Sequence, residues 1–183
     1  VVTDERRGVL IFCRTRRRAG WVHSALRRHA MSVGLVHGDR SQKQRNRALD
    51  LFSEGASGVL VATDVAARGL DVKGLPFVIN VTLPDKSEDY VHRIGRVGRA
   101  DTMGLAISIV AAFQERVWYC QKKGHKPWFD PSVQDSAQHC VWYDEPKLLK
   151  DIETRIKTPV ARIDPTTLAL PKELLDKLGQ AGK

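Results

Sequence analysis

Five short apolar runs, rich in β-branched residues, recur along the first 110 residues of the chain. Continuous apolar runs of this kind are typical of strands that are buried on both faces of a parallel sheet. Polar segments separate each run from the next. The five runs are residues 8–13, 32–37, 58–63, 77–82 and 105–110.

Two of the intervening segments carry an apolar stripe at helical spacing. In the first, Ala19, Val22 and Leu26 fall on one helical face, while arginines crowd the other. The second begins with Ser41 and has Gln44 three residues later, which is a capping-box pattern. The alternation of strands and helices predicts an α/β fold, with a parallel sheet covered by helices on both faces.

The chain after residue 110 follows a different pattern. Two similar strand-like pieces, "RVWYC" and "HCVWY", flank a polar segment, and we expect an insertion at about 115–143 that forms a β-hairpin or loop. Apolar residues at helical spacing then predict a last helix over residues 146–156. Prolines interrupt the rest of the chain. We therefore assign residues 1–158 to one domain and residues 159–183 to a C-terminal extension.

Composition and charge narrow the class of protein. With 183 residues and 42% hydrophobic content, the chain can bury one good core, which excludes a disordered protein. Lys and Arg number 30 against 21 Asp and Glu, so the net charge of +9 favours a polyanionic partner. Because the chain starts at Val1 directly ahead of an apolar run, we expect it to be a piece of a longer protein.

The cysteines and the apolar runs indicate the compartment. Three cysteines are an odd and sparse set, which favours a reducing, intracellular location, cytoplasmic or nuclear, over a disulfide-bonded scaffold. No apolar run approaches the length needed to span a membrane, and no signal peptide is visible, so we expect no membrane partner.

Charged or glycine-rich segments follow the predicted strands. Parallel sheets bind ligands beyond the carboxyl ends of their strands, so these segments predict a ligand site at that edge. Taken alone, Arg14 or Arg45 is more often a solvated side chain than a ligand contact. The segments are "RTR", "HGDRSQKQR", "DVAARGLDV" and "HRIGRVGR".

Over residues 8–110, this order of segments resembles the second, C-terminal RecA-like domain of a DEAD-box RNA helicase. "VLIFCRTR", "VHGDRSQKQRNRALDLFSEG", "VLVATDVAARGLDV" and "YVHRIGRVGR" match the family's motifs IV, IVa, V and VI. Val97 and the two "VWY" pieces are most similar to the branch that carries a SPRY domain in its first lobe. Val97 also departs from the family, which usually has a threonine there, and we expect this to tune activity rather than abolish it.

The resemblance implies a site for ATP hydrolysis shared between two lobes. Arg96 and Arg99 act as arginine fingers on the γ-phosphate, with His92 and Arg93 supporting the interface between the lobes. Their spacing of three places both fingers on one face of a helix. The resemblance also assigns Arg68, Gly69, Asp71 and Arg93 to the nucleotide, with Asp71 accepting from the ribose hydroxyls.

The remaining motif residues face RNA in the family pattern. We expect them to contact the backbone, because a helicase binds its strand without reading sequence. Asp64 lies beside them, and a simpler role for it is to cap the short helix that follows. The expected RNA-binding residues are Arg14, Thr15, His37, Gly38, Gln42, Arg45 and Thr63.

Two parts of an ATPase are missing from the sequence. There is no G-x-x-x-x-G-K-[ST] loop and no Asp-Glu-Ala-Asp magnesium site, so ATP and Mg²⁺ would be held mainly by a first lobe upstream. This fragment alone should hydrolyse essentially no ATP. We expect no metal site of its own, because Cys120, His125, His139 and Cys140 lack a Cys-x-x-Cys pair.

Two other functions fit the same residues. The lobe could be an RNA- or protein-binding module of a complex that turns over no ATP, or part of a DNA translocase. The helicase is favoured by the presence of Asp71, Arg96 and Arg99. The binding module remains compatible with Val97 and the insertion. Protein partners would bind through the insertion.

Overall fold

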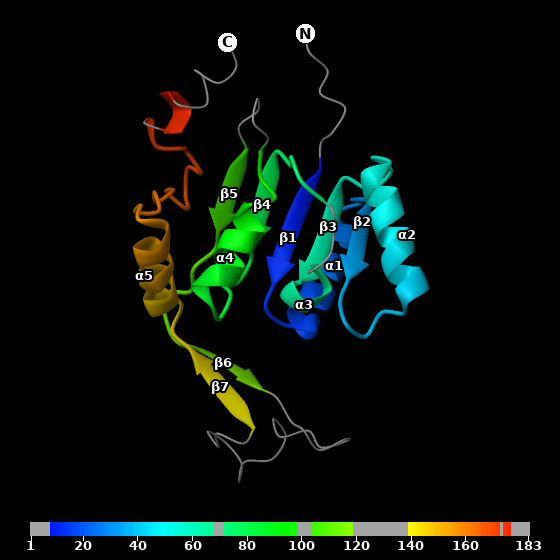
Figure 1. Ribbon diagram of the computed structural model, residues 1–183, viewed down its shortest axis with the longest axis horizontal. Helices are drawn as coiled ribbons and strands as arrows, with labels where there is room; N and C mark the ends of the chain where they lie inside the picture. The colour runs from blue at the N-terminus through cyan, green and yellow to red at the C-terminus, as the bar shows by residue number, and fades with distance from the viewer. Residues whose placement is uncertain (1–7, 68–71, 99–103, 119–138, 173, 177–183) are drawn as a thin grey trace.

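The computed structural model describes residues 8–67, 72–98, 104–118, 139–172 and 174–176. A five-stranded sheet lies at its centre, and every neighbouring pair of strands is parallel (Figure 1). Each strand falls inside one of the five apolar runs, so the predicted parallel sheet is confirmed. In sheet order the strands are β2 (Val33–Val36), β3 (Val59–Thr63), β1 (Val9–Cys13), β4 (Phe77–Asn80) and β5 (Leu105–Ser108).

Helices cover both faces of the sheet, as predicted (Figure 1). Alternate residues of a strand point to opposite faces, so Ile11 packs with Val22 of α1 on one face, while Leu10 packs with Phe52 of α2 on the other. The Arg93 guanidinium of α4 lies over the Phe12 ring, on the α2 side. The helices around the sheet are α1 (Arg16–Arg28), α2 (Gln42–Ser53), α3 (Asp64–Ala67) and α4 (Ser87–Ile94).

Side-chain caps fix the first two helices at the carboxyl edge of the sheet. Thr15 Oγ1 accepts a hydrogen bond from the Arg18 backbone N–H and so caps α1. Ser41 and Gln44 form the predicted capping box at the start of α2. Both helices therefore begin within the polar segments that follow β1 and β2.

Helix α4 ends earlier than the sequence predicts. It stops at Ile94, and the chain then forms a parallel bridge between Val97 and Leu75. The Leu75 N–H donates to the Arg96 carbonyl, and the Gly98 N–H donates back to the Leu75 carbonyl. The prediction that Arg96 and Arg99 project from one helical face is therefore wrong: Arg96 lies in the turn beyond the helix, and Arg99 lies outside the described residues.

The two "VWY" pieces form the base of a hairpin beyond the carboxyl edge of the sheet (Figure 1). Strands β6 (Glu115–Trp118) and β7 (Cys140–Tyr143) pair antiparallel, with Glu115 opposite Tyr143. This confirms the hairpin, while its status as an insertion into the family's fold stays a prediction. The residues between the two strands, 119–138, lie outside the described ones.

The last helix packs beside α4. Helix α5 (Glu145–Ile156) begins one residue before the predicted range, with Asp144 capping it through the Lys147 N–H. Ile152 of α5 joins Leu83 and Tyr90 in a third apolar cluster. Within the described ranges, no helix is both long and apolar enough to cross a membrane.

Candidate functional site

The predicted ligand residues after β1, β2 and β3 meet at one edge of the sheet. Strand β3 lies between the other two, and Thr63 at its end stands in register with Cys13 of β1. Thr15 follows β1, and His37 and Gly38 follow β2. Gln42 and Arg45 lie in the first turn of α2, next along the chain. The sheet therefore brings together three segments that the sequence predicts to bind RNA.

Gly38 leaves an open stretch of backbone at this edge. It is exposed, and a Cβ built there would meet no atom within 4 Å. Its φ also lies outside the left-handed region, so the local conformation does not require glycine. Packing and conformation thus give no reason for a glycine here, whereas the close approach of a ligand to the backbone would.

His37 is held neutral beside this glycine. Its Nδ1 accepts a hydrogen bond from the Asp39 N–H at 3.3 Å, which requires an unprotonated nitrogen. Burial, together with the positive charge of Arg40, lowers the pKa of His37 below its ordinary value, against the opposing effect of Asp39. The imidazole is therefore a hydrogen-bonding group near neutral pH and not a fixed charge.

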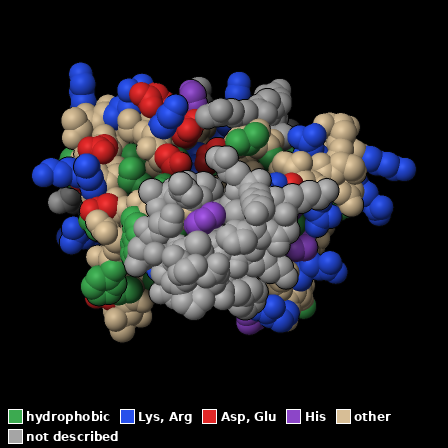
Figure 2. All heavy atoms as spheres, turned by 90° about the horizontal axis from the view of Figure 1, so that it is seen from below, with side chains coloured by type: hydrophobic (Ala, Val, Ile, Leu, Met, Phe, Trp, Pro, Cys, Tyr) green, Lys and Arg blue, Asp and Glu red, His purple; other side chains and the backbone are tan. Residues whose placement is uncertain are grey.

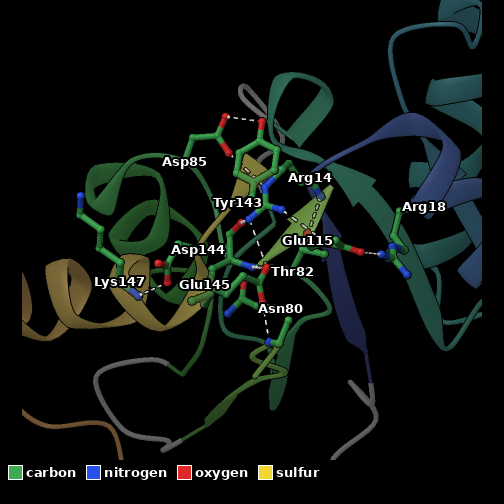
Figure 3. A network of polar contacts seen from close by, with 12 residues as sticks. Arg14, Arg18, Asn80, Thr82, Asp85, Glu115, Tyr143, Asp144, Glu145 and Lys147 are labelled. Carbon is green, nitrogen blue, oxygen red and sulfur yellow. Dashed lines mark hydrogen bonds and ion pairs between the residues drawn. The ribbon is translucent and has the colours of Figure 1, made fainter. Parts of the chain in front are cut away.

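The Arg14 side chain is turned into the lobe, and its predicted contact with RNA stays a prediction (Figure 3). Its side chain is 6% exposed, and Nη2 donates to the Leu83 carbonyl at 2.7 Å and to Glu145 Oε1 at 3.1 Å. Nε forms an ion pair with Asp85 at 3.1 Å, and the guanidinium stacks 3.7 Å from the centre of the Tyr143 ring. Arg14 therefore joins the end of β1 to α5 and the hairpin.

Glu145 is the buried centre of that network, and the sequence reasoning missed it. Besides Arg14, its Oε1 accepts from the Leu83 N–H at 3.0 Å and its Oε2 from the Ala111 N–H at 2.8 Å. The available signal was an Asp-Glu-Pro sequence ahead of a helical pattern, which marks a helix start. That signal places Glu145 in a first turn but does not show that its carboxylate is buried.

The Tyr143 hydroxyl, on β7 of the hairpin, also belongs to this network. It donates to Asp85 Oδ2 at 3.4 Å. Burial and the neighbouring Asp85 carboxylate raise the pKa of Tyr143, while Arg14 partly opposes them. Tyr143 therefore remains a neutral donor.

Arg93 is likewise used inside the lobe. Its side chain is 1% exposed, and Nε and Nη2 each lie 2.6 Å from a carboxylate oxygen of Asp64. Nη1 donates to Asn80 Oδ1 at 3.0 Å and to the Thr82 carbonyl at 2.7 Å. This geometry does not favour the predicted contact with nucleotide. It also gives Asp64 a role other than capping a helix, because the carboxylate fixes α4 to the start of α3.

Arg96 contacts the residue that follows the segment predicted to hold nucleotide. Its Nη1 donates to the carbonyl of Val72, the residue directly after Asp71, at 3.4 Å. Arg93 contacts Asp64, so the two arginines make contacts on either side of residues 68–71. His92 is exposed in the last turn of α4. The remaining predicted nucleotide and finger residues, Arg68, Gly69, Asp71 and Arg99, lie outside the described ones.

Lys and Arg are prominent among the described side chains around this end of the molecule. Seen from the side of the hairpin, Lys and Arg side chains project around most of the rim, and Asp and Glu gather on one part of it (Figure 2). Within the described residues, no group of three or more His, Cys, Asp or Glu side chains could hold a metal ion. The chemistry available at this edge is hydrogen-bond donation and positive charge.

Comparisons with known proteins identify the family of this chain and several relatives. The family described as "Helicase conserved C-terminal domain" matches residues 2–101. The ATP-dependent RNA helicase Ddx1 of Drosophila melanogaster is 43% identical over 164 residues, which are 86% of this chain and 22% of that protein. The probable ATP-dependent RNA helicase ddx1 of Dictyostelium discoideum is 43% identical over 160 residues, 80% of this chain and 21% of that protein. The chain thus spans about a fifth of the length of these relatives.

Solved structures show the same fold. The E. coli DEAD-box protein SrmB, determined bound to regulator of ribonuclease activity A, has a TM-score of 0.65 and 30% identity over 93% of this chain and 82% of that chain. A DEAD box protein from Methanococcus jannaschii has a TM-score of 0.65 and 33% identity over 89% of this chain and 36% of that chain.

Proposed function

This chain belongs to the helicase conserved C-terminal domain family, as the C-terminal RecA-like lobe of a DEAD-box RNA helicase, and on that premise we propose that it completes an ATPase shared with a preceding lobe. The observation that carries the proposal is the pair of contacts around residues 68–71. Arg93 holds Asp64 on one side of that segment, and Arg96 contacts Val72 on the other.

The proposed ATPase role rests on the donors that this lobe can offer. ATP bound between the lobes would supply the γ-phosphate, and Arg96 and Arg99 would neutralise the charge that builds on it. Asp71 would accept from the ribose hydroxyls, Gly69 would allow close backbone approach, and Arg68 would link the segment to its neighbour.

The other residues of this edge would position those groups. Exposed His92 would face the first lobe, and we propose that Arg93 acts through Asp64 as a positioning residue rather than on the nucleotide itself. Mg²⁺ would be held by the first lobe, so the isolated lobe should be inactive.

We further propose that the carboxyl edge binds the RNA backbone. The open backbone at Gly38 and neutral His37 supply contacts that suit phosphate and ribose and that carry no base specificity. The direct contacts would come from Thr15, His37, Gly38, Gln42, Arg45 and Thr63. Arg14 would act indirectly, by fixing the backbone on which Thr15 stands. Membership of the branch with a SPRY domain in its first lobe stays a prediction.

RNA-stimulated ATP hydrolysis by the protein extended upstream through its first lobe tests this function. Arg96→Ala and Arg99→Ala should each lower the rate by about 10³-fold or more while RNA binding persists, because arginine fingers act on the transition state. Arg27→Ala, an exposed arginine in the last turn of α1, is the matched control and should leave the rate unchanged. A wild-type protein that binds RNA but turns over no ATP would contradict the proposal and favour the binding module.

A further inference from the structure

Thr15, one of the predicted RNA contacts, lies between two arginines that contact the hairpin. Arg14 comes directly before it, and the Arg18 backbone N–H donates to Thr15 Oγ1 at 3.1 Å. Arg14 stacks on Tyr143 of β7, and both arginines pair with the Glu115 carboxylate of β6. The chain on either side of Thr15 is therefore tied to one small part of the hairpin.

Glu115 and Tyr143 act from the same face of the hairpin, and we call them the basal pair. They stand opposite each other across β6 and β7, and opposite residues of an antiparallel pair project on one side. Figure 3 shows both side chains beside Arg14. Trp142, the residue before Tyr143, projects from the other face and is 49% exposed. The basal pair thus faces the lobe, while its neighbour on β7 does not.

Tyr143 holds the Arg14 side chain at the edge of the sheet. The guanidinium lies 3.7 Å from the ring centre, and the Tyr143 hydroxyl bonds Asp85, whose carboxylate pairs with Arg14 Nε at 3.1 Å. The backbone N–H of Arg14 donates to Thr82 Oγ1 at 2.8 Å. A cation covered by an aromatic face is held by that face, so loss of the ring should loosen Arg14 and the residue that follows it.

The Thr15 hydroxyl has a proton to donate. Its oxygen accepts from Arg18 as the cap of α1, and a hydroxyl that accepts in this way still carries one O–H donor. Within the part of the chain that the structure describes, no acceptor takes that proton. A phosphate oxygen is a strong acceptor, and hydrogen bonds weaken steeply as they lose alignment. A small shift of the backbone at residues 14 and 15 should therefore weaken a contact between Thr15 and RNA.

We infer that the basal pair positions Thr15 for the RNA backbone, so that the hairpin supports RNA binding through the lobe. Thr15 makes the contact, and Tyr143 is a positioning residue that acts on it through Arg14. The inference rests on the proposed function, because it requires Thr15 to contact RNA. It also gives the hairpin a role that needs no separate partner.

Double-mutant cycles of RNA affinity test this inference in the protein extended through its first lobe. Tyr143→Leu keeps the net charge and the apolar bulk but removes the flat ring, and RNA affinity should fall about fivefold. Tyr143→Phe keeps the ring over Arg14 and should bind within about twofold of the wild type. In a Thr15→Ala background, Tyr143→Leu should change the affinity by less than about twofold, because the contact that it positions is already lost. In a Gly38→Ala background the fivefold loss should persist, since Gly38 lies on another segment.

Trp142→Leu is the matched control, because it makes a similar change on the same strand but on the opposite face. Its RNA affinity should stay within about twofold of the wild type. Circular dichroism at the assay temperature checks that each variant is folded. If Tyr143→Leu does not fold, Tyr143→Met takes its place, because a flexible methionine fills irregular gaps in a core.

Wild-type affinity in Tyr143→Leu overturns the inference. So does an equal loss in the Thr15→Ala background, because the ring would then stabilise the lobe without acting through Thr15. Equal weakness of the Phe and Leu variants would exclude a role for the ring. In each of these cases, a loss of affinity in Thr15→Ala alone would leave the proposed RNA edge intact. Wild-type affinity in Thr15→Ala instead removes Thr15 from that edge and overturns the inference with it.

Discussion

Arg93 and Asp64 form a two-point ion pair, with Nε and Nη2 of the arginine each 2.6 Å from a different carboxylate oxygen. The pair joins α4 to α3, which follows β3 directly. A planar guanidinium matches a carboxylate at two points, so the pair fixes an orientation as well as a distance. Through it, the helix that precedes Arg96 is fixed to the short helix that comes directly before residues 68–71 in the chain.

Replacing Asp64 with Asn should destabilise the lobe markedly. The substitution keeps the size of the side chain but leaves the buried Arg93 guanidinium without its opposite charge, which costs about 3 kcal/mol in the free energy of unfolding. Denaturant unfolding monitored by circular dichroism measures the change. Asp50→Asn, an exposed position on α2, is the control and should stay within about 0.5 kcal/mol. Equal stability of the two variants would contradict the structural role of the pair.

Glu145→Gln should be costly although the two side chains have nearly the same shape. Both Glu145 oxygens accept from backbone N–H groups, so an amide nitrogen at either position would face a donor. The Arg14 guanidinium would also lose a buried counter-charge, and we expect a total loss of about 3 kcal/mol in the free energy of unfolding. Thermal and denaturant unfolding test this against Glu54→Gln, an exposed position after α2. Glu145→Gln should also disrupt the contacts of the hairpin. A change in Trp fluorescence would report that disruption.

The sheet was predictable because its signal is local. Buried parallel strands require apolar, β-branched runs, and all five were visible in the sequence. The capping box at Ser41 was predictable for the same reason, since both partners lie within three residues. Local patterns of this kind depend little on the rest of the fold.

The errors came from contacts between distant parts of the chain. Spacing predicted a helix through Arg96, but Leu75 pairs with Val97 instead, and Gly98 adopts a left-handed φ of 67°. Gly104 leaves room for that pairing, as its added Cβ would lie 2.6 Å from the Leu75 carbonyl. The contact between Arg14 and Glu145 was missed as well, because the two residues are 131 positions apart in the sequence. No sequence pattern around Arg14 predicts such a distant partner.

Gly38→Ala and Gly104→Ala should separate ligand binding from packing. An added methyl at Gly38 meets no protein atom, so the free energy of unfolding should stay within about 0.5 kcal/mol, while RNA affinity falls because the methyl blocks backbone approach. At Gly104 the methyl collides with the Leu75 carbonyl and the Gly98 nitrogen, and a loss of about 2 kcal/mol should follow. Unfolding and RNA titration of both variants, in the protein extended through its first lobe, provide the comparison. Unchanged RNA affinity in Gly38→Ala would remove Gly38 from the proposed groove.

Cys13 should make the stability of the lobe fall in alkaline solution. The thiol is fully buried beneath α1, and burial raises its pKa to about 11, against a smaller lowering by the Arg93 charge. A free thiol in the unfolded chain has a pKa of about 8.5, so the unfolded state loses its proton first. The contribution of the buried, protonated Cys13 thiol to the free energy of unfolding is therefore fully present below about pH 8.5. It is lost as the pH rises toward 11, by about 1.4 kcal/mol per pH unit within that window. Denaturant unfolding of the wild type and of Cys13→Ala between pH 8 and 10.5 measures it. The alanine variant, which carries no thiol, should lack this part of the slope, and identical slopes would show that Cys13 does not titrate as its burial requires.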